Sequence, residues 1–550
     1  MPNAPDPVIA TSSVPALLAE AAARFPHHHA IDFFGRKLTY AELAHRVDRA
    51  ARGFQNLGVG RGTRVGLCLP NSPYFIIAYY AVLKVGGIIV NFNPLHVARE
   101  LAQQIEDSGT TIMVTLDVAK IYPKVGEVLA TTSLEKIVVC SLRAALPPGK
   151  GLLFGLFKGK ELARIPRDGK HVRFESLFAD RAAPTPVAIN PAIDLAVLQY
   201  TGGTTGVPKG AMLSHANLTA NVAQIVDRVS ALRPGQERAL VLLPLFHVFG
   251  MTTCMNLCIS LGVEMVLLPS FDLAQVLKFI VKKKPTLFPG VPSLFATLSH
   301  KAERGKFDLS SIRYCISGGA PLPLETRQRF ESLTGCKLVE GYGLTETSPV
   351  VAANQLDTPY KNESVGPPLK GTIVEIRSLD DPTKILGTGE RGEICLRGPQ
   401  IMAGYWRNLQ ETKAVFIAGS LRTGDVGYLD EDGDLFLVDR IKDIIICNGF
   451  KVYPRNIEEA LLQHPAVAEA VAIGIADPMR GHVPKAFVTL VPGVTATSGE
   501  ILEFLKIHLS RLELPRAIEI RETLPKTNIG KISRKDLVLE EAQNSTSASA

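Results

Sequence analysis

Short runs of apolar, mostly β-branched residues recur along this chain, with longer helix-forming segments between them. Strands that are apolar on both faces are typical of parallel sheets covered by helices on both sides. The alternation therefore predicts an α/β fold with parallel or mixed sheets in the larger, N-terminal part of the chain. The runs are RVGLCLP (64–70), GGIIVNF (86–92), TIMVTL (111–116), KIVVC (136–140) and VEMVLLP (263–269).

The pattern changes after about residue 365, where turns of glycine and acidic residues such as DEDGD (430–434) separate short strands. This spacing predicts a small antiparallel β subdomain. The segment from PRNIEEALLQ (454–463) onward predicts a compact α+β unit. Because 550 residues are too many for a single core, we expect an N-terminal domain over residues 1–439 and a smaller C-terminal domain over residues 440–550.

Composition narrows the possible classes of function. A net charge of +7 is small for 550 residues, so no nucleic-acid partner is expected. The eight cysteines are dispersed and complete no metal-binding pattern, which indicates reduced thiols and a cytoplasmic protein. The N-terminus lacks a secretory signal pattern. The longest apolar stretch, YFIIAYYAVLKVGGIIV (74–90), is interrupted by Lys84 and two glycines, so it predicts a buried helix and strand and no membrane span.

The stretch YTGGTTGVPKG (200–210) follows an apolar strand and contains four glycines, three threonines and one lysine. Glycine allows backbone N–H groups to converge on an anion, and threonine hydroxyls and a lysine ammonium add further donors. The stretch therefore predicts a phosphate-binding loop. It is not a P-loop of the nucleotide triphosphatases, because Gly210 stands after Lys209 where that motif needs a serine or threonine.

Four further stretches each have an ordinary structural explanation when taken alone: EGYGLTETSP (340–349), RTGDVGYLDEDG (422–433), DRIKD (439–443) and PKTNIGKISRK (525–535). Together with residues 200–210, and in this order, they resemble the adenylate-forming superfamily of acyl-CoA synthetases, adenylation domains and firefly luciferase. The resemblance extends from LTYAEL (38–43) to GKISRK (530–535). The chain is most similar to bacterial long-chain fatty acyl-CoA ligases, through Gly202, FPGVPSLF (288–295) and DRIKDIIICNGFKVYP (439–454).

The resemblance implies two half-reactions. The carboxylate of a medium- to long-chain fatty acid attacks the α-phosphate of ATP bound to Mg²⁺, which forms an acyl-adenylate and pyrophosphate. The thiol of coenzyme A then displaces AMP and forms a thioester. Two alternatives stay open: an aryl or short branched acid:CoA ligase, and an acyl-AMP ligase that loads a carrier protein. The oligomeric state also stays open, with a homodimer as one option.

The resemblance also assigns roles to residues of the reacting centre. Lys531 would bridge the fatty carboxylate and the α-phosphate, and Thr345 would bond the α-phosphate. His247, in PLFHVFG (244–250), would lie near the reacting carboxyl group, although a hydrogen-bonded core histidine is the alternative. Mg²⁺ would be held by Glu346 and Thr201. The β- and γ-phosphates would be bound by Thr201, Thr204, Thr205 and Lys209.

The remaining assignments concern the nucleoside and the second half-reaction. Asp425 would accept hydrogen bonds from both ribose hydroxyls, supported by Arg440. Lys442 matches the family's hinge, about which the C-terminal domain rotates between the half-reactions, and Gly449 would leave room for the pantetheine arm. The adenine would lie between Tyr342 and the backbone of SGGAP (317–321), in a pocket that also includes Gly318, Gly319, Ala320, Glu340 and Gly341.

One segment is not explained by this chemistry. Residues 147–173, PPGKGLLFGLFKGKELARIPRDGKHVR, mix leucine and phenylalanine with seven basic and two acidic residues. One interpretation is an insertion loop on the protein surface. The other is an interfacial contact at the inner face of the membrane, with phenylalanines entering the lipid and basic residues on its headgroups. Both interpretations stay open at this point.

Overall fold

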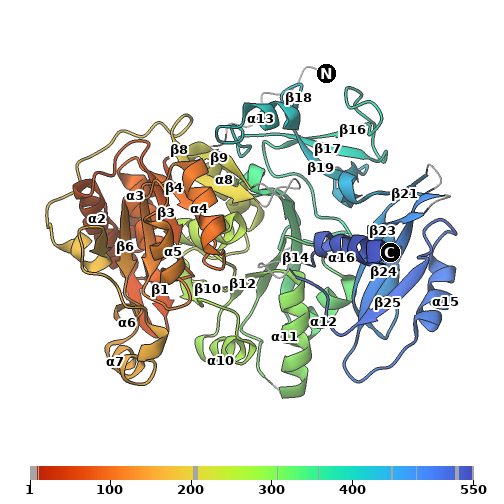
Figure 1. Ribbon diagram of the computed structural model, residues 1–550, viewed down its shortest axis with the longest axis horizontal. Helices are drawn as coiled ribbons and strands as arrows, with labels where there is room; N and C mark the ends of the chain where they lie inside the picture. The colour runs from red at the N-terminus through yellow and green to blue at the C-terminus, as the bar shows by residue number, and fades with distance from the viewer. Residues whose placement is uncertain are drawn as a thin grey trace.

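A computed structural model of the chain describes residues 9, 11–201, 208–305, 307–356, 358–447, 450–477, 480–526 and 532–547. Four sheets with flanking helices form the molecule (Figure 1). The first two sheets make up the larger part of the N-terminal half. The third is small and antiparallel, and the fourth belongs to a separate α+β unit at the C-terminal end. The predicted α/β fold class, with its antiparallel subdomain and C-terminal α+β domain, is confirmed.

The first sheet has seven strands in the order β7-β6-β5-β3-β4-β8-β9. All neighbouring strands are parallel except β8 and β9, which are antiparallel. Its buried strands coincide with the apolar runs of the sequence, which confirms that part of the prediction. The bounds are β3 (Arg64–Cys68), β4 (Ile88–Asn91), β5 (Ile112–Leu116), β6 (Lys136–Cys140), β7 (His171–Arg173), β8 (Leu195–Thr201) and β9 (Lys209–Ser214).

The second sheet has eight strands in the order β15-β14-β13-β12-β10-β11-β1-β2. The central strands are parallel, and the antiparallel strands β15 and β2 lie at the two edges. The bounds are β1 (His29–Phe33), β2 (Arg36–Thr39), β10 (Arg238–Val241), β11 (Glu264–Leu267), β12 (Leu287–Gly290), β13 (Tyr314–Ser317), β14 (Lys337–Gly343) and β15 (Val350–Ala353).

Helices cover these two sheets, and one of them explains the longest apolar stretch. Helix α3 is buried along its whole length except at Lys84, because helices α1 and α2 pack against it, and it leads into the buried strand β4. The predicted buried helix and strand are therefore confirmed. The helices are α1 (Val14–Arg24), α2 (Tyr40–Asn56), α3 (Pro73–Lys84), α4 (Ala98–Ser108), α5 (Tyr122–Val128), α8 (His215–Arg228), α9 (Leu257–Ser260), α10 (Leu273–Lys283), α11 (Pro292–Gly305) and α12 (Leu324–Thr334).

The expected insertion loop over residues 147–173 is instead largely regular structure. It contains helix α7 (Pro148–Phe157), the 3₁₀ turn η1 (Gly159–Glu161) and strand β7, and it follows the short helix α6 (Leu142–Ala145). A 3₁₀ segment, η2 (Phe174–Phe178), leads back toward the first sheet. The segment forms a helix because Pro147 and Pro148 start it and glycines at positions 151 and 155 permit its close packing on α6. The sequence analysis did not predict this helix, and the assignment of residues 147–173 as an insertion stays a prediction.

The third sheet is entirely antiparallel and has the order β16-β17-β19-β18, with β20 paired to β19. Its strands are β16 (Ile373–Arg377), β17 (Gly392–Arg397), β18 (Phe416–Ile417), β19 (Ser420–Leu429) and β20 (Leu435–Arg440), and helix α13 spans Leu409–Val415. The GTGERG stretch (387–392) lies in the turn before β17, as a hairpin connection requires.

The 3₁₀ turn η5 (Ile441–Asp443) connects β20 to the fourth sheet. This sheet has the order β22-β21-β24-β23, with β25 paired in parallel to β24. Its strands are β21 (Ile445–Cys447), β22 (Phe450–Val452), β23 (Val467–Asp477), β24 (Gly481–Leu490) and β25 (Ala517–Arg521). Its helices are α14 (Pro454–Leu462), α15 (Ser498–His508) and α16 (Arg534–Ser547). Across the described ranges, no helix is both long enough and apolar enough to cross a membrane.

Candidate active site

Strands of two different sheets bring three predicted nucleotide-binding side chains together. Tyr342 lies on β14, and its hydroxyl donates a 2.7 Å hydrogen bond to Asp425 Oδ2 on β19. On the other side, Arg440 Nε lies 3.1 Å from Asp425 Oδ1. Tyr342 and Asp425 are buried, whereas the Arg440 side chain is 52% exposed. The carboxylate is therefore fixed at the border between the core and solvent.

The protonation states in this group follow from its burial. Burial, followed by the negative charge of Asp425, raises the pKa of the Tyr342 phenol well above its ordinary value. The phenol therefore stays protonated and serves as the hydrogen-bond donor. The Asp425 carboxylate also raises the pKa of Arg440, so the guanidinium stays charged at neutral pH.

The RTGD stretch positions Asp425 through its backbone. Gly424 has φ of +72°, a conformation that glycine adopts without strain, and the β17–β19 register is irregular at this point. Thr423 Oγ1 accepts a 3.0 Å hydrogen bond from the Asp425 N–H and donates one of 2.8 Å to the carbonyl of Ile394. The register then places Asp425 directly opposite Arg440 on β20. Thr423 and Gly424 thus both contribute to holding the carboxylate.

The predicted adenine pocket lies at the carboxyl ends of β13 and β14, where ligands bind in open α/β sheets. Ser317 at the end of β13 is the register partner of Glu340 on β14, so the segments 318–320 and 340–342 begin side by side. A Cβ on Gly318 would lie 3.0 Å from the Phe249 ring, and Gly319 has φ of +85°. These positions therefore accept glycine more readily than any larger residue, and they keep this wall free of side chains.

Glu340 has the most strongly perturbed carboxyl group of this pocket. Burial raises its pKa to about 7, and the positive charge of Arg455 opposes the effect. The backbone N–H of Leu322 donates a 3.2 Å hydrogen bond to Glu340 Oε1. Since Arg455 belongs to α14 of the C-terminal unit, the pKa of the Glu340 carboxyl group depends on the position of that unit.

On the predicted phosphate side, Tyr405 connects Lys209 with Glu346. Its hydroxyl donates a 2.7 Å hydrogen bond to Glu346 Oε1, and Lys209 Nζ lies 5.5 Å from the centre of its ring. Lys209 Nζ also forms a 2.5 Å ion pair with Glu411 Oε2. Glu346 follows Thr345 in the 3₁₀ turn η4 (Thr345–Thr347), and both side chains are half-buried. The Lys209 ammonium and the Glu346 carboxylate therefore lie around the same tyrosine, Tyr405. Binding of a metal–phosphate group requires a cation and a carboxylate that are close together in this way.

The oxygen ligands at this place suit Mg²⁺ better than a softer metal. Among the described residues, no group of three or more His, Cys, Asp and Glu side chains is arranged to hold a metal ion. Mg²⁺ that arrives with a nucleotide needs only one or two carboxylates, because phosphates and waters complete its shell. The Glu346 carboxylate, oriented by Tyr405, and the Thr201 hydroxyl are ligands of this kind.

Several predicted residues lie outside the described part of the chain. They are Thr204 and Thr205 of the phosphate-binding stretch, Gly449, and Lys531. The described residues that flank two of these segments pair with one another. Thr201 at the end of β8 pairs in register with Lys209 at the start of β9, and Lys526 forms a β-bridge with Ile532. The roles of the four residues stay predictions.

His247 precedes a π-helical segment, η3 (Gly250–Asn256), and such segments are frequent at functional sites. Its Nδ1 accepts a 3.3 Å hydrogen bond from the Phe249 N–H, and its side chain is half-buried. Thr252 Oγ1 in η3 donates a 2.7 Å hydrogen bond to the carbonyl of Ser348, which follows η4. The segment that carries His247 is therefore connected to the segment that carries Thr345. This position fits either of the two roles considered for the histidine.

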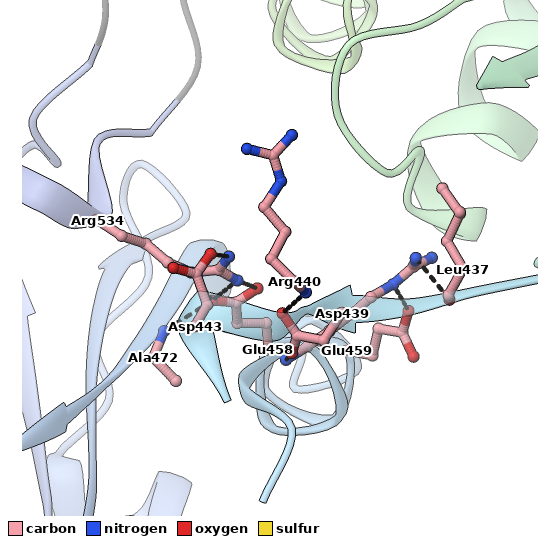
Figure 2. Close-up of polar contacts among 9 residues, drawn as sticks. Leu437, Asp439, Arg440, Asp443, Glu458, Glu459, Ala472 and Arg534 are labelled. Carbon is pink, nitrogen blue, oxygen red and sulfur yellow. Dashed lines mark hydrogen bonds and ion pairs between the residues drawn. The ribbon is translucent and has the colours of Figure 1, made fainter. Parts of the chain in front are cut away.

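The predicted hinge at Lys442 lies in η5, directly after Arg440. Partial burial lowers the pKa of the Lys442 ammonium, and Asp443 opposes this effect. Arg455 at the start of α14 holds the C-terminal unit to β20. Its N–H donates a 2.8 Å hydrogen bond to Asp439 Oδ2, and its Nη1 donates one of 2.8 Å to the carbonyl of Leu437 (Figure 2).

A second arginine connects the end of the chain to the same hinge (Figure 2). Arg534 Nη2 lies 2.7 and 2.6 Å from the two carboxylate oxygens of Glu458, and Arg534 Nη1 lies 3.0 Å from Asp443 Oδ2. Glu458 Oε1 also accepts a 2.8 Å hydrogen bond from the Ala472 N–H. The turn η5, α14, β23 and α16 thus meet in one charged cluster.

Sequence reasoning missed the supporting residues of both groups: Tyr405, Glu411, Arg455, Glu458 and Arg534. These residues lie outside the stretches that carry the resemblance or at their margins. Arg534 belongs to PKTNIGKISRK (525–535), but its partner Glu458 stands 76 positions earlier in the chain. No signal in a single sequence pairs such residues.

Comparison with known proteins agrees with this geometry. The family model described as "AMP-binding enzyme" matches residues 18–406, and the model "AMP-binding enzyme C-terminal domain" matches residues 456–531. The long-chain-fatty-acid–CoA ligase of Bacillus subtilis (strain 168) is 43% identical over 532 residues, which cover 96% of this chain and 94% of the relative. That of Salmonella typhimurium is 36% identical over 533 residues, with 96% and 94% covered.

Solved structures show the same architecture. The structure of the anthranilate CoA ligase AuaEII in complex with anthranoyl-AMP matches with a TM-score of 0.86 at 26% identity, covering 98% of each chain. The two family models, the relatives matched over nearly their whole length and the shared fold lead to one conclusion. This chain belongs to the AMP-binding enzyme family and carries both its large domain and its C-terminal domain.

Proposed function

We propose that this protein is an AMP-forming ligase that activates a medium- to long-chain fatty acid to its coenzyme A thioester through an acyl-adenylate. The observation that carries the proposal is the 43% identity, over 96% of the chain, to a relative named long-chain-fatty-acid–CoA ligase. The group formed by Tyr342, Asp425 and Arg440 supports it, because a carboxylate that is fixed at the border between the core and solvent suits a ribose.

The chemistry explains why the site needs cations. A fatty carboxylate and a triphosphate repel each other, so the protein has to supply positive charge where the two meet. Lys209 supplies charge at the phosphate side, and we propose that Lys531 supplies it at the α-phosphate, where a flexible ammonium follows the moving charge. Thr345 would donate to the same phosphate. Mg²⁺ held by Glu346 and Thr201 would neutralise charge on the outer phosphates.

We also propose that the C-terminal domain, residues 440–550, rotates about Lys442 between the half-reactions. One orientation would present Lys531 to the α-phosphate, and the other would place Gly449 beside the thiol arm of coenzyme A. Domain motion of this kind lets one nucleotide site serve two reactions. The charged cluster around Asp443 and Arg534 would then move as part of the rotating unit.

An aryl acid:CoA ligase is the second candidate, because the anthranilate CoA ligase AuaEII shares the fold over 98% of each chain. A third candidate is an acyl-AMP ligase that loads a carrier protein. Since long fatty acids partition into lipid, the proposal also includes a peripheral contact with the membrane through residues 147–173.

The test is AMP release from ATP against a panel of carboxylic acids from octanoate to oleate, with benzoate and coumarate, each with and without coenzyme A. CoA-dependent AMP release that is highest with a fatty acid supports the proposal. A maximum with benzoate or coumarate would favour the aryl ligase. An adenylate that forms but is not consumed by coenzyme A would favour the carrier-protein ligase.

A further inference from the structure

Helix α7 presents four of its apolar side chains to solvent, and its Gly151 and Gly155 to the protein. The exposed fractions of Leu152, Leu153, Leu156 and Phe157 are 58%, 54%, 71% and 82%. The opposite face packs on α6: a Cβ on Gly151 would lie 2.5 Å from the Arg143 carbonyl oxygen, and one on Gly155 would lie 2.6 Å from the Arg143 guanidinium. Exposed apolar clusters of this kind mark contacts with proteins or membranes.

The helix projects from the body of the molecule next to α6, at the end opposite α15 (Figure 1). The chain around its C-terminal end is rich in exposed basic side chains, with Glu161 and Asp168 as the acidic ones between residues 147 and 173. Lys158 pairs with Glu161 at 3.0 Å, and Asp168 bonds His171. The exposed basic residues are Lys150, Lys158, Lys160, Arg164, Arg167, Lys170 and Arg173. An apolar helix bordered by positive charge complements an anionic membrane surface.

A cavity of about 330 Å³ lies beside α6, between α2 and α3. It contains the side chains of Arg46 and Arg49, which are half-buried on α2. Within the described residues, neither guanidinium has a hydrogen bond or ion pair, and Arg49 Nε is buried without a partner. Leaving a buried charged donor unpaired is costly, so an anion in the cavity would stabilise it.

The remaining wall of the cavity favours an amphiphile over a small inorganic anion. Leu38, Ile77 and Phe178 give it an apolar side, and Ala144 and Ala145 of α6 form the side next to α7. Arg36 also lines it and donates to the carbonyl of Ala144, which ties the cavity to α6. Burial, followed by the positive charge of Arg36, lowers the pKa of Arg46, and the negative charge of Glu42 opposes this effect. Glu175 is the acidic residue of the lining, and it accepts a hydrogen bond from Tyr74.

We propose that this cavity binds the phosphate headgroup of an anionic phospholipid while Leu156 and Phe157 of α7 enter the surrounding lipid. Arg46 and Arg49 are the ligands of the phosphate, and the basic residues of 158–173 lie on neighbouring headgroups. The inference rests on the membrane contact of the proposed function, but not on the ligase chemistry, because the cavity shares no residue with the candidate active site.

The test is cosedimentation of the full-length protein with vesicles of phosphatidylcholine alone or with 30% phosphatidylglycerol, without ATP or coenzyme A. We expect binding that depends on phosphatidylglycerol. At about 1 kcal/mol per basic residue, the R46Q/R49Q variant should bind these vesicles about thirtyfold more weakly. The L156S/F157S variant should also bind more weakly. The matched control is K506Q/R511Q, which removes two exposed basic residues near α15 and should bind as the wild type does.

Three outcomes would overturn the proposal. If R46Q/R49Q bound vesicles as tightly as the wild type, the cavity would take no part in membrane binding. If L156S/F157S bound as tightly as the wild type, helix α7 would take no part in it. Equal competition by free inorganic phosphate would show a simple anion site and no lipid site. Turnover of octanoate, a soluble acid, reports independently on the ligase and on folding. If R46Q/R49Q does not fold, the proposal can be tested by hydrogen exchange of the wild-type protein with and without vesicles. Vesicles should slow exchange in α2, α6 and α7. Unchanged exchange in these helices would contradict the proposal.

Discussion

Arg534 provides the most direct test of how the C-terminal domain is held to the turn η5, the proposed hinge. Its guanidinium contacts both oxygens of Glu458 and one of Asp443, at 2.6 to 3.0 Å (Figure 2). Removing one partner of a buried ion pair costs about 3–5 kcal/mol. Because the Arg534 side chain is 27% exposed, we expect the lower value of about 3 kcal/mol for Arg534→Met, which keeps an apolar stem but removes the charge.

The assay is hydrogen exchange, because the single tryptophan of the chain, Trp406, precedes this domain and does not report on it. The Ala472 amide on β23 donates to Glu458, so peptides of β23 and α16 should lose protection first. A loss of about 3 kcal/mol corresponds to roughly a hundredfold faster exchange through local opening. The matched control is Lys506→Met, which removes an exposed pair with Glu503 in the same domain and should change exchange less than threefold.

The loss should depend on pH in a defined direction. Burial raises the pKa of Glu458 even with Arg534 present. Without the arginine the carboxyl is held more strongly in its protonated form, so the deficit should grow as the pH rises and shrink toward pH 5. If the Arg534→Met variant exchanged at pH 8 as slowly as the Lys506→Met control, the reasoning would be refuted. The charged cluster would then contribute nothing measurable to the stability of the domain.

Three further predictions concern the active site. Lys531→Ala should slow adenylate formation by orders of magnitude while thioester formation from preformed acyl-adenylate stays nearly intact, and equal loss of both steps would contradict its role. Tyr405→Phe should raise the Mg²⁺ concentration for half-maximal activity about tenfold, because it frees the Glu346 carboxylate from its hydrogen bond; an unchanged Mg²⁺ titration would count against this metal site. Burial raises the pKa of Glu340 from 4.5 to about 7, so the folded state favours the protonated acid, and stability should fall by about 3 kcal/mol as the pH rises from below 4.5 to above 7. The Tm of the Glu340→Gln variant should therefore fall less between pH 5 and pH 8 than the Tm of the wild type. An equal fall would show that the raised pKa of Glu340 does not cause this pH dependence.

The sequence predicted the strands of the parallel sheets well. Both faces of each strand are buried, so each strand appears in the sequence as a short continuous apolar run. It also predicted the antiparallel subdomain, whose turns need glycine at positive φ, as at Gly419 and Gly433. The helix α7 was missed. Gly151 and Gly155 face the protein and the leucines face solvent, so the usual relation between apolar pattern and burial is reversed there.

The candidate site was predicted through its motif residues and not through their partners. Tyr342, Asp425 and Arg440 come from three separate stretches, and the structure brings them within hydrogen-bonding distance. Tyr405 and Arg534 act by orienting other groups, and their contacts span long separations in the chain. Such pairs depend on the packing of distant strands and helices, which a single sequence does not encode in any local pattern.

The central claim is that the carboxylic acid is activated as an adenylate before coenzyme A takes part. Exchange of labelled pyrophosphate into ATP, measured with oleate and Mg²⁺ but without coenzyme A, tests it most directly. We expect pyrophosphate exchange that requires oleate and that is abolished in the Lys531→Ala variant. Exchange that requires coenzyme A, or formation of ADP and phosphate in place of AMP and pyrophosphate, would contradict it.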